Sequence, residues 1–226
     1  MTENKYLMSK KQNTQSSKLT SFSICILKYV YIKLEHLSKK YKIIANDVKK
    51  IYFGKKFNMI RLAYFSDLDN VKKLTEACAQ EMISRKIFQW NEHYPSRETF
   101  EKDIMNRELY VAEIDNSIVG CIMFSKLKDA VYNEIEWLTP DLNNLYIHRL
   151  AVHPKNQKKG LARSMMDFAE EEAIKMNCIS VRLDTFSQNP RNSKFYNSRD
   201  YIQLGDIYFP KQSEYPFYCF EKIMKH

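Results

Sequence analysis

The stretch LAVHPKNQKKGLAR, residues 150–163, decides the fold. An apolar strand ends at Val152, and Pro154 stops further pairing because proline has no amide hydrogen. The pattern Q-x-x-G-x-A at residues 157–162 then leads into an amphipathic helix. The first amides of a helix have no partner inside it and carry partial positive charge, so they bind phosphate oxygens. The stretch predicts a strand–loop–helix unit able to hold a diphosphate, although a helix that merely begins with glycine would satisfy the same pattern.

Strands and helices alternate on both sides of this unit. Apolar residues recur at three- and four-residue steps after the capping residues Ser66 and Asp67, and Ser96 caps a second helix. Asp115-Asn116-Ser117 has the composition of a hairpin turn, and residues 128–144 form a longer polar connection. We expect strands at 60–65, 109–114, 118–127, 145–152, 179–185, 201–208 and 217–224, and helices at 68–88, after 96, at 160–176 and at 191–198. This order predicts a mixed α/β sheet with helices on both faces.

Two further segments, ISVRLDT at 179–185 and NPRNSKFY at 189–196, follow as a strand and a helix. With the strand–Q-x-x-G-x-A–helix unit they resemble the GNAT superfamily of N-acetyltransferases, and the order of elements agrees from Met59 onward. The resemblance implies an α/β, GNAT-like fold with a mixed, mostly antiparallel central sheet of about six to seven strands flanked by helices on both faces. It implies direct transfer of the acetyl group of acetyl-CoA, a co-substrate, to a primary amine of a small molecule or peptide. At Asp200 the family usually has glycine, but aspartate tolerates the left-handed backbone conformation.

The resemblance also implies roles for single residues. The Val152 amide would stabilise the oxyanion, and Tyr196 would protonate the departing CoA thiolate unless it only packs in the core. His148 would accept the proton of the amine, with Glu134, Glu136 or a chain of waters as alternatives. The implied contacts with acetyl-CoA come from Leu150, Ala151, Val152, Gln157, Lys158, Lys159, Gly160, Leu161, Ala162, Arg163 and Asn189.

Aromatic side chains are candidates for the walls of the acceptor pocket, although core or rim packing would also account for them. These residues are Trp90, Tyr94 and Tyr218, with Tyr215 and Phe217 beside them. The carboxylates that could hold a cationic acceptor are Glu92, Glu136 and Glu214. No metal is implied, and none of the five cysteines lies beside the cofactor motif as a nucleophile.

Positive charge is concentrated at the start of the chain. Residues 1–57 contain 13 Lys/Arg and 3 Asp/Glu, a net charge of +10, whereas residues 58–226 contain 23 and 24, a net charge of −1. We therefore expect a basic extension at 1–57, partly disordered or helical, and an acetyltransferase domain at 58–226. Met59 is an alternative natural start. Binding of nucleic acid would involve the extension alone.

The composition restricts the classes of protein to which this chain can belong. There is no run of 18 apolar residues, so no membrane span is expected. The five cysteines are an odd number without a C-x-x-C pair, which indicates reduced thiols and a cytoplasmic protein. The expected partners are acetyl-CoA and an amine acceptor, and a homodimer is possible. Two alternatives stay open: a non-catalytic acyl-CoA-binding regulator of the same fold, and a nucleic-acid-binding protein acting through its basic extension.

Overall fold

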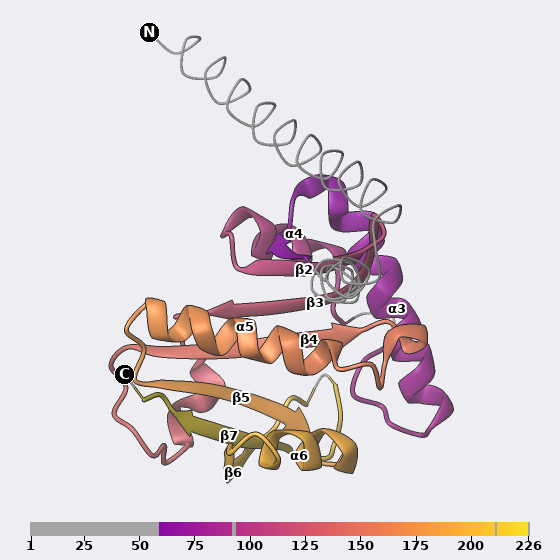
Figure 1. Ribbon diagram of the computed structural model, residues 1–226. Helices are drawn as coiled ribbons and strands as arrows, with labels where there is room; N and C mark the ends of the chain where they lie inside the picture. The colour runs from indigo at the N-terminus through magenta and orange to yellow at the C-terminus, as the bar shows by residue number, and fades with distance from the viewer. Residues whose placement is uncertain (1–58, 92–93, 211, 226) are drawn as a thin grey trace, which may run out of the picture. The chain divides into compact units, whose positions relative to one another are not determined.

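A single seven-stranded sheet forms the centre of the computed structural model, which describes residues 59–91, 94–210 and 212–225 (Figure 1). The strand order is β1-β2-β3-β4-β5-β7-β6, and every neighbouring pair is antiparallel except β4 and β5, which are parallel. The strands are β1 (Met59–Leu62), β2 (Leu109–Ile114), β3 (Ser117–Ser125), β4 (Asn144–Val152), β5 (Ser180–Phe186), β6 (Ile202–Ile207) and β7 (Phe217–Ile223). The predicted mixed, mostly antiparallel sheet is confirmed. The predicted extension at 1–57 lies outside the described residues, and its boundary with the domain stays a prediction.

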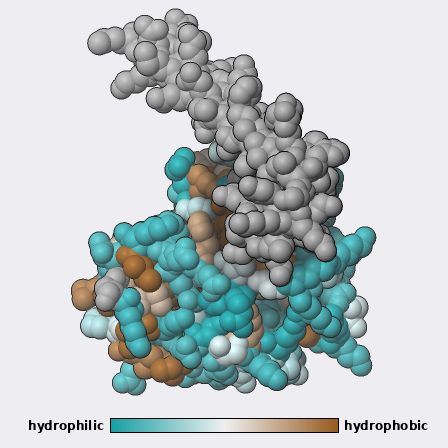
Figure 2. Space-filling model, viewed as in Figure 1, coloured by the Kyte–Doolittle hydropathy of each residue, from teal (hydrophilic) through white to brown (hydrophobic). Residues whose placement is uncertain are grey.

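Helices cover both faces of this sheet, as predicted. On one face lie α5 (Leu161–Lys175) and α6 (Pro190–Asn197), and α5 crosses β3, β4 and β5 (Figure 1). This side of the molecule is mostly hydrophilic at its surface (Figure 2). The other face is covered by α3 (Leu68–Ser84), α4 (Arg97–Met105) and the connection between β3 and β4, which contains the short 3-10 helix η2 (Ala130–Glu134). Among the described helices, none is long and apolar enough to cross a bilayer.

The four α-helices in the described part of the chain end in the same hydrogen-bonded motif without glycine. A residue with positive φ follows each helix: Lys86, Arg107, Asn177 and Asp200. After α3, for example, the Ile87 amide donates to the Met82 carbonyl and the Lys86 amide to the Ile83 carbonyl, which is the Schellman pattern. This motif ends α3 at Ser84, four residues before the predicted end. The expectation that Asp200 adopts the left-handed conformation is confirmed by its φ of 65°.

Two irregularities in the middle of the sheet shape the candidate site: a bulge between β3 and β4, and a separation of β4 from β5. The β3–β4 register shifts at His148, because Met123 lies opposite Arg149 whereas Phe124 lies opposite Ile147. Pairing between β4 and β5 is limited to residues 144–147 with 180–183. Beyond Ile147 the two parallel strands separate, so the second half of β4 has a strand on one side only.

Candidate active site

The free edge of β4 turns main-chain groups toward this separation. The His153 amide donates to the Val119 carbonyl across the β3 edge at 2.9 Å. In an antiparallel pair, hydrogen-bonded and non-hydrogen-bonded positions alternate. Leu150 and Val152, opposite Ile122 and Gly120, are therefore at non-hydrogen-bonded positions, and their N–H and C=O groups point away from β3. The Val152 carbonyl accordingly accepts from Gln157 Nε2 at 3.1 Å.

The start of α5 supplies further main-chain donors. Gly160 is the N-cap, with φ of 85°, and a Cβ placed on it would meet no atom within 4 Å. The first bond of the helix runs from the Ser164 amide to the Gly160 carbonyl at 3.0 Å, so the amides of residues 161–163 precede it. Three consecutive amides at a helix start, with open space above the glycine, form a site for an anion.

These two elements border one cleft, with a volume of about 200 Å³. It is open on one side, and both α3 and α6 contribute to its walls. Its lining includes the predicted Leu150, Ala151, Val152, Gln157, Ala162, Asn189 and Tyr196, and Trp90 from the predicted acceptor aromatics. Arg85, Arg191 and Phe195 also line it and were not predicted. A strand edge without a neighbouring strand and the first amides of a helix, which border the same cleft, suit the amide-bearing arm and the diphosphate of acetyl-CoA. Lys158, Lys159 and Arg163 are exposed beside it, while the Leu161 side chain is buried in the core.

Tyr196 lines this cleft. Its side chain is only 6% exposed and packs against Phe195, Tyr201 and Phe220 at ring distances of 5.3 to 5.9 Å. Burial, together with the negative charge of Asp184, raises the pKa of Tyr196, so its hydroxyl holds its proton near neutral pH. Tyr196 thus packs in the core and also lines the cleft, and its predicted role as the acid stays a prediction.

His148 lies on the opposite face of the sheet, in an aromatic stack. Its ring is 6.1 Å from Tyr132 and 6.5 Å from Tyr146, nearly parallel to both. Burial, assisted by the positive charge of Arg149, lowers the pKa of His148 to about 4. The imidazole is therefore neutral at physiological pH. The alternative bases Glu134 and Glu136 are exposed to solvent.

Arg149 forms a buried ion pair next to this stack. Its Nη2 lies 2.5 Å from Asp103 Oδ2 of α4, and both side chains are less than 10% exposed. The phenol of Tyr94 lies near the guanidinium group, whose charge partly offsets the burial that raises the pKa of Tyr94. Arg149 Nε is buried without a hydrogen-bond partner among the described residues. The pair fixes α4 and the 94–96 loop against β4.

The predicted acceptor aromatics occupy three different environments. Trp90 lines the cleft beside β4 and α5, Tyr94 packs beside Arg149, and Tyr218 is half-buried on β7 against the core under α5 and α6. A separate groove of about 450 Å³ opens between the end of α3 and the loop before β7. It is lined by Lys86, Phe88, Phe186, Gln188, Ser213, Glu214 and Tyr215. Phe217 is buried in the core, and Glu92 lies outside the described residues.

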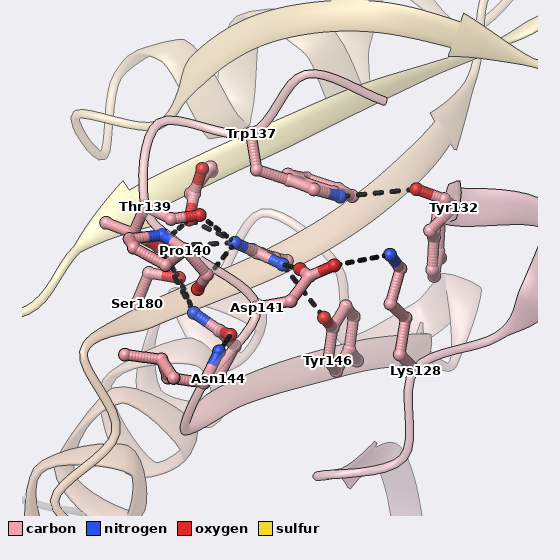
Figure 3. Close-up of polar contacts among 12 residues, drawn as sticks. Lys128, Tyr132, Trp137, Thr139, Pro140, Asp141, Asn144, Tyr146 and Ser180 are labelled. Carbon is pink, nitrogen blue, oxygen red and sulfur yellow. Dashed lines mark hydrogen bonds and ion pairs between the residues drawn. The ribbon is translucent and has the colours of Figure 1, made fainter. Parts of the chain in front are cut away.

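A polar network beneath the connection 126–143 was not predicted from the sequence. Its centre is Arg182, a fully buried residue of β5 that pairs with the buried Glu221 of β7 at 2.9 Å. Figure 3 shows Thr139, Pro140 and Asp141 of the connection gathered with Tyr146 of β4. Arg182 bonds Asp141, the Thr139 carbonyl and the Tyr146 hydroxyl, and its guanidinium carbon lies 4.5 Å from the Trp137 ring.

This network holds η2 in place over β5. The Trp137 indole donates to the Tyr132 carbonyl at 3.4 Å (Figure 3). The Tyr132 hydroxyl, in turn, donates to Asp184 on β5. Tyr132 was also missed from the sequence, since the polar composition of residues 128–144 gives no periodic signal. Asp184 was predicted only as part of the strand ISVRLDT.

Comparison with known proteins agrees with this geometry. The profile of the acetyltransferase (GNAT) family matches residues 72–201, more than half of the chain. The chain therefore belongs to the GNAT family of acetyltransferases and is an acyltransferase. The family uses acetyl-CoA as co-substrate. Curated proteins gave no match in sequence.

Solved structures show the same fold. A protein of Staphylococcus aureus Mu50 assigned as an acetyltransferase is 27% identical, with a TM-score of 0.59 over 74% of this chain and 99% of that one. A GNAT-family acetyltransferase of Streptococcus agalactiae 2603 is 24% identical, with a TM-score of 0.65 over 74% and 96%. Ard1 of Thermoplasma volcanium is 18% identical, with a TM-score of 0.57 over 75% and 99%. The last two likenesses concern the fold alone.

Proposed function

We propose that this protein transfers the acetyl group of acetyl-CoA directly to a primary amine of a small molecule or peptide. The observation that carries the proposal is the free edge of β4, whose Val152 and Leu150 main-chain groups face the same cleft as the first amides of α5. Acetyl-CoA supplies the thioester carbonyl that the amine attacks.

Each part of the cleft has a proposed task. The amides of residues 157–162 bind the diphosphate, with Lys158, Lys159 and Arg163 adding positive charge, and Asn189 bonds the cofactor arm. The free main-chain groups of Leu150 and Val152, on either side of Ala151, bind the arm as an added strand would. The Val152 amide stabilises the oxyanion, which for a positioned donor is worth roughly 3 kcal/mol. Tyr196 donates its proton to the sulfur as the carbon–sulfur bond breaks.

The acceptor enters from the opposite side, through the groove between Phe88 and Tyr215. Phe186 lines this groove and lies on the same strand and face as Asp184, the first residue of β5 beyond its pairing with β4. Glu214 at its mouth suits a cationic amine. The cytoplasmic location and the homodimer remain predictions from the sequence.

The experiment measures acetyl-CoA affinity by calorimetry and release of free CoA thiol against a panel of amines and peptides. Tyr196→Phe should lower kcat by about 100-fold while the Kd for acetyl-CoA stays the same. Gly160→Asn should keep the fold, because asparagine tolerates positive φ, yet weaken acetyl-CoA binding by filling the anion site. No heat with any CoA ester would refute the cleft assignment. Binding without transfer to any amine would instead favour a non-catalytic acyl-CoA-binding regulator.

A further inference from the structure

Asp184 is the first residue of β5 beyond the part that pairs with β4. Pairing ends at Leu183 opposite Ile147, so Asp184 lies where the strands begin to separate. Residues alternate along β5, and Leu183 faces the core under α5. Asp184 therefore faces the other side of the sheet, with Arg182 and Phe186, and Phe186 lines the proposed acceptor groove. It remains partly accessible although protein surrounds it.

The Asp184 carboxylate has a hydroxyl partner and no cation within ion-pair distance among the described residues. Its bonded partner is Tyr132, 52 positions earlier in the chain. Buried carboxylates are normally paired or multiply hydrogen-bonded because an isolated charge is costly in a poorly polar surrounding. A carboxylate left in this state, where two strands separate, is a candidate functional group.

Several ionisable groups surround Asp184 from different elements. Burial raises the pKa of Asp184 to about 6, opposed by the Tyr132 hydrogen bond, raised further by Asp129 and lowered by Arg149. Burial and the negative charge of Asp184 raise the pKa of four groups: Tyr94 of the loop before α4, Tyr132 of η2, Tyr196 of α6 and Cys219 of β7. A group with this pKa is largely ionised at pH 7 and still basic enough to accept a proton.

We propose that Asp184, hydrogen-bonded by Tyr132, is the catalytic residue that takes the proton of the attacking amine nitrogen; this inference rests on the acetyl transfer proposed above. The neutral amine forms a nitrogen–carbon bond with the thioester carbonyl, and one N–H proton passes to the Asp184 carboxylate. The carbon–sulfur bond breaks, its electron pair remains on sulfur, and the sulfur takes the proton of the Tyr196 hydroxyl. Asp184 then returns its proton through water to the Tyr196 phenolate, so both residues end as they began.

The charge of Asp184 links the two proton transfers. While ionised, Asp184 helps to hold the proton on Tyr196 by raising its pKa. Once Asp184 has accepted the proton of the amine, that negative charge is gone and Tyr196 becomes a stronger acid. The proton for the leaving thiolate is thus released more readily after the nucleophile has attacked. His148 is the competing candidate, but with a pKa of about 4 its imidazole binds a proton weakly.

The test compares Asp184→Asn with His148→Gln on the full chain. Asparagine keeps the size of the side chain and can still accept from Tyr132. For the wild type we expect kcat/KM to fall below about pH 6, following the ionisation of Asp184. Asp184→Asn should lower kcat by about 100-fold, lose that acidic limb and keep the acetyl-CoA affinity. Asp206→Asn, an exposed residue of β6, is the matched control and should change neither.

Three results would overturn the inference. In the first, Asp184→Asn keeps both its rate and its acidic limb. In the second, His148→Gln loses the limb and Asp184→Asn does not. The third needs no activity or variant: carbon-13 carboxyl resonances of aspartate-labelled wild type would show no aspartate titrating near pH 6. Each of these three results leaves the proposed function standing, whereas a wild type that binds acetyl-CoA but acetylates no amine would overturn the proposed function and, with it, this inference.

Discussion

Arg182 and Asp184 lie two residues apart on the same face of β5, yet their surroundings differ in kind. Arg182 is fully buried and has donors bonded to Glu221, Asp141, Tyr146 and the Thr139 carbonyl. Asp184 has the Tyr132 hydroxyl and no bonded cation among the described residues. A complete polar network stabilises a unique arrangement, whereas an incomplete one keeps a reactive group available. The difference separates the part of β5 that holds the structure from the part that we propose does chemistry.

The largest expected effect is the loss of the complete network. Arg182→Met should lower the free energy of unfolding by about 3–5 kcal/mol, because it leaves the Glu221 carboxylate buried without a cation. Urea denaturation followed by circular dichroism measures this change. The double variant Arg182→Met with Glu221→Leu is the control, and it should recover most of the loss since apolar groups replace both charges. A loss below about 1 kcal/mol in the single variant would contradict the role of the network.

Asp184→Asn should have the opposite effect on stability. Folding raises the pKa of Asp184 from 3.8 to about 6, so the folded state binds its proton more tightly than the unfolded state. Well below pH 3.8 the carboxyl is neutral in both states and does not affect stability. As pH rises from 4 to 6 the unfolded chain ionises first, and the wild type loses about 1–3 kcal/mol relative to the variant.

Thermal or urea unfolding of both proteins between pH 4.5 and 8 measures this difference. The advantage of Asp184→Asn should grow with pH and level off above pH 6. An advantage that is constant over the whole range would mean that ionisation of Asp184 is not its cause. A less stable variant at pH 8 would show that the carboxylate is a structural group, like Glu221.

Much of the fold could be predicted from the sequence because its signals are local. The strand ending at Val152 and the helix after Gly160 follow from apolar periodicity and glycine and proline placement, and both agree with β4 and α5. The end of α3 was placed too late because Lys86, not glycine, adopts the left-handed conformation there. A lysine gives no local sign of that role.

The candidate site was predictable only where main-chain groups form it. The cleft contains the expected Val152, Gln157, Asn189 and Tyr196 because their positions follow from one strand–loop–helix unit and the next. Asp184 was visible only as an alternating residue of ISVRLDT. Nothing local distinguishes it from Arg182, since the partner of Arg182 comes from β7, 39 positions away, through strand pairing.

Two Tyr→Phe variants, with the smallest expected effects, test the contrast between Arg182 and Asp184 most directly. Tyr132→Phe removes the hydrogen bond that lowers the pKa of Asp184, so the acidic limb of kcat/KM should move up by about one pH unit. Tyr146→Phe removes a hydroxyl bonded to Arg182 at 2.9 Å and is the matched control. It should leave the limb in place and lower the urea midpoint slightly, because Arg182 retains its other partners. If both variants moved the limb equally, the two clusters would act as one electrostatic unit and the contrast along β5 would be wrong.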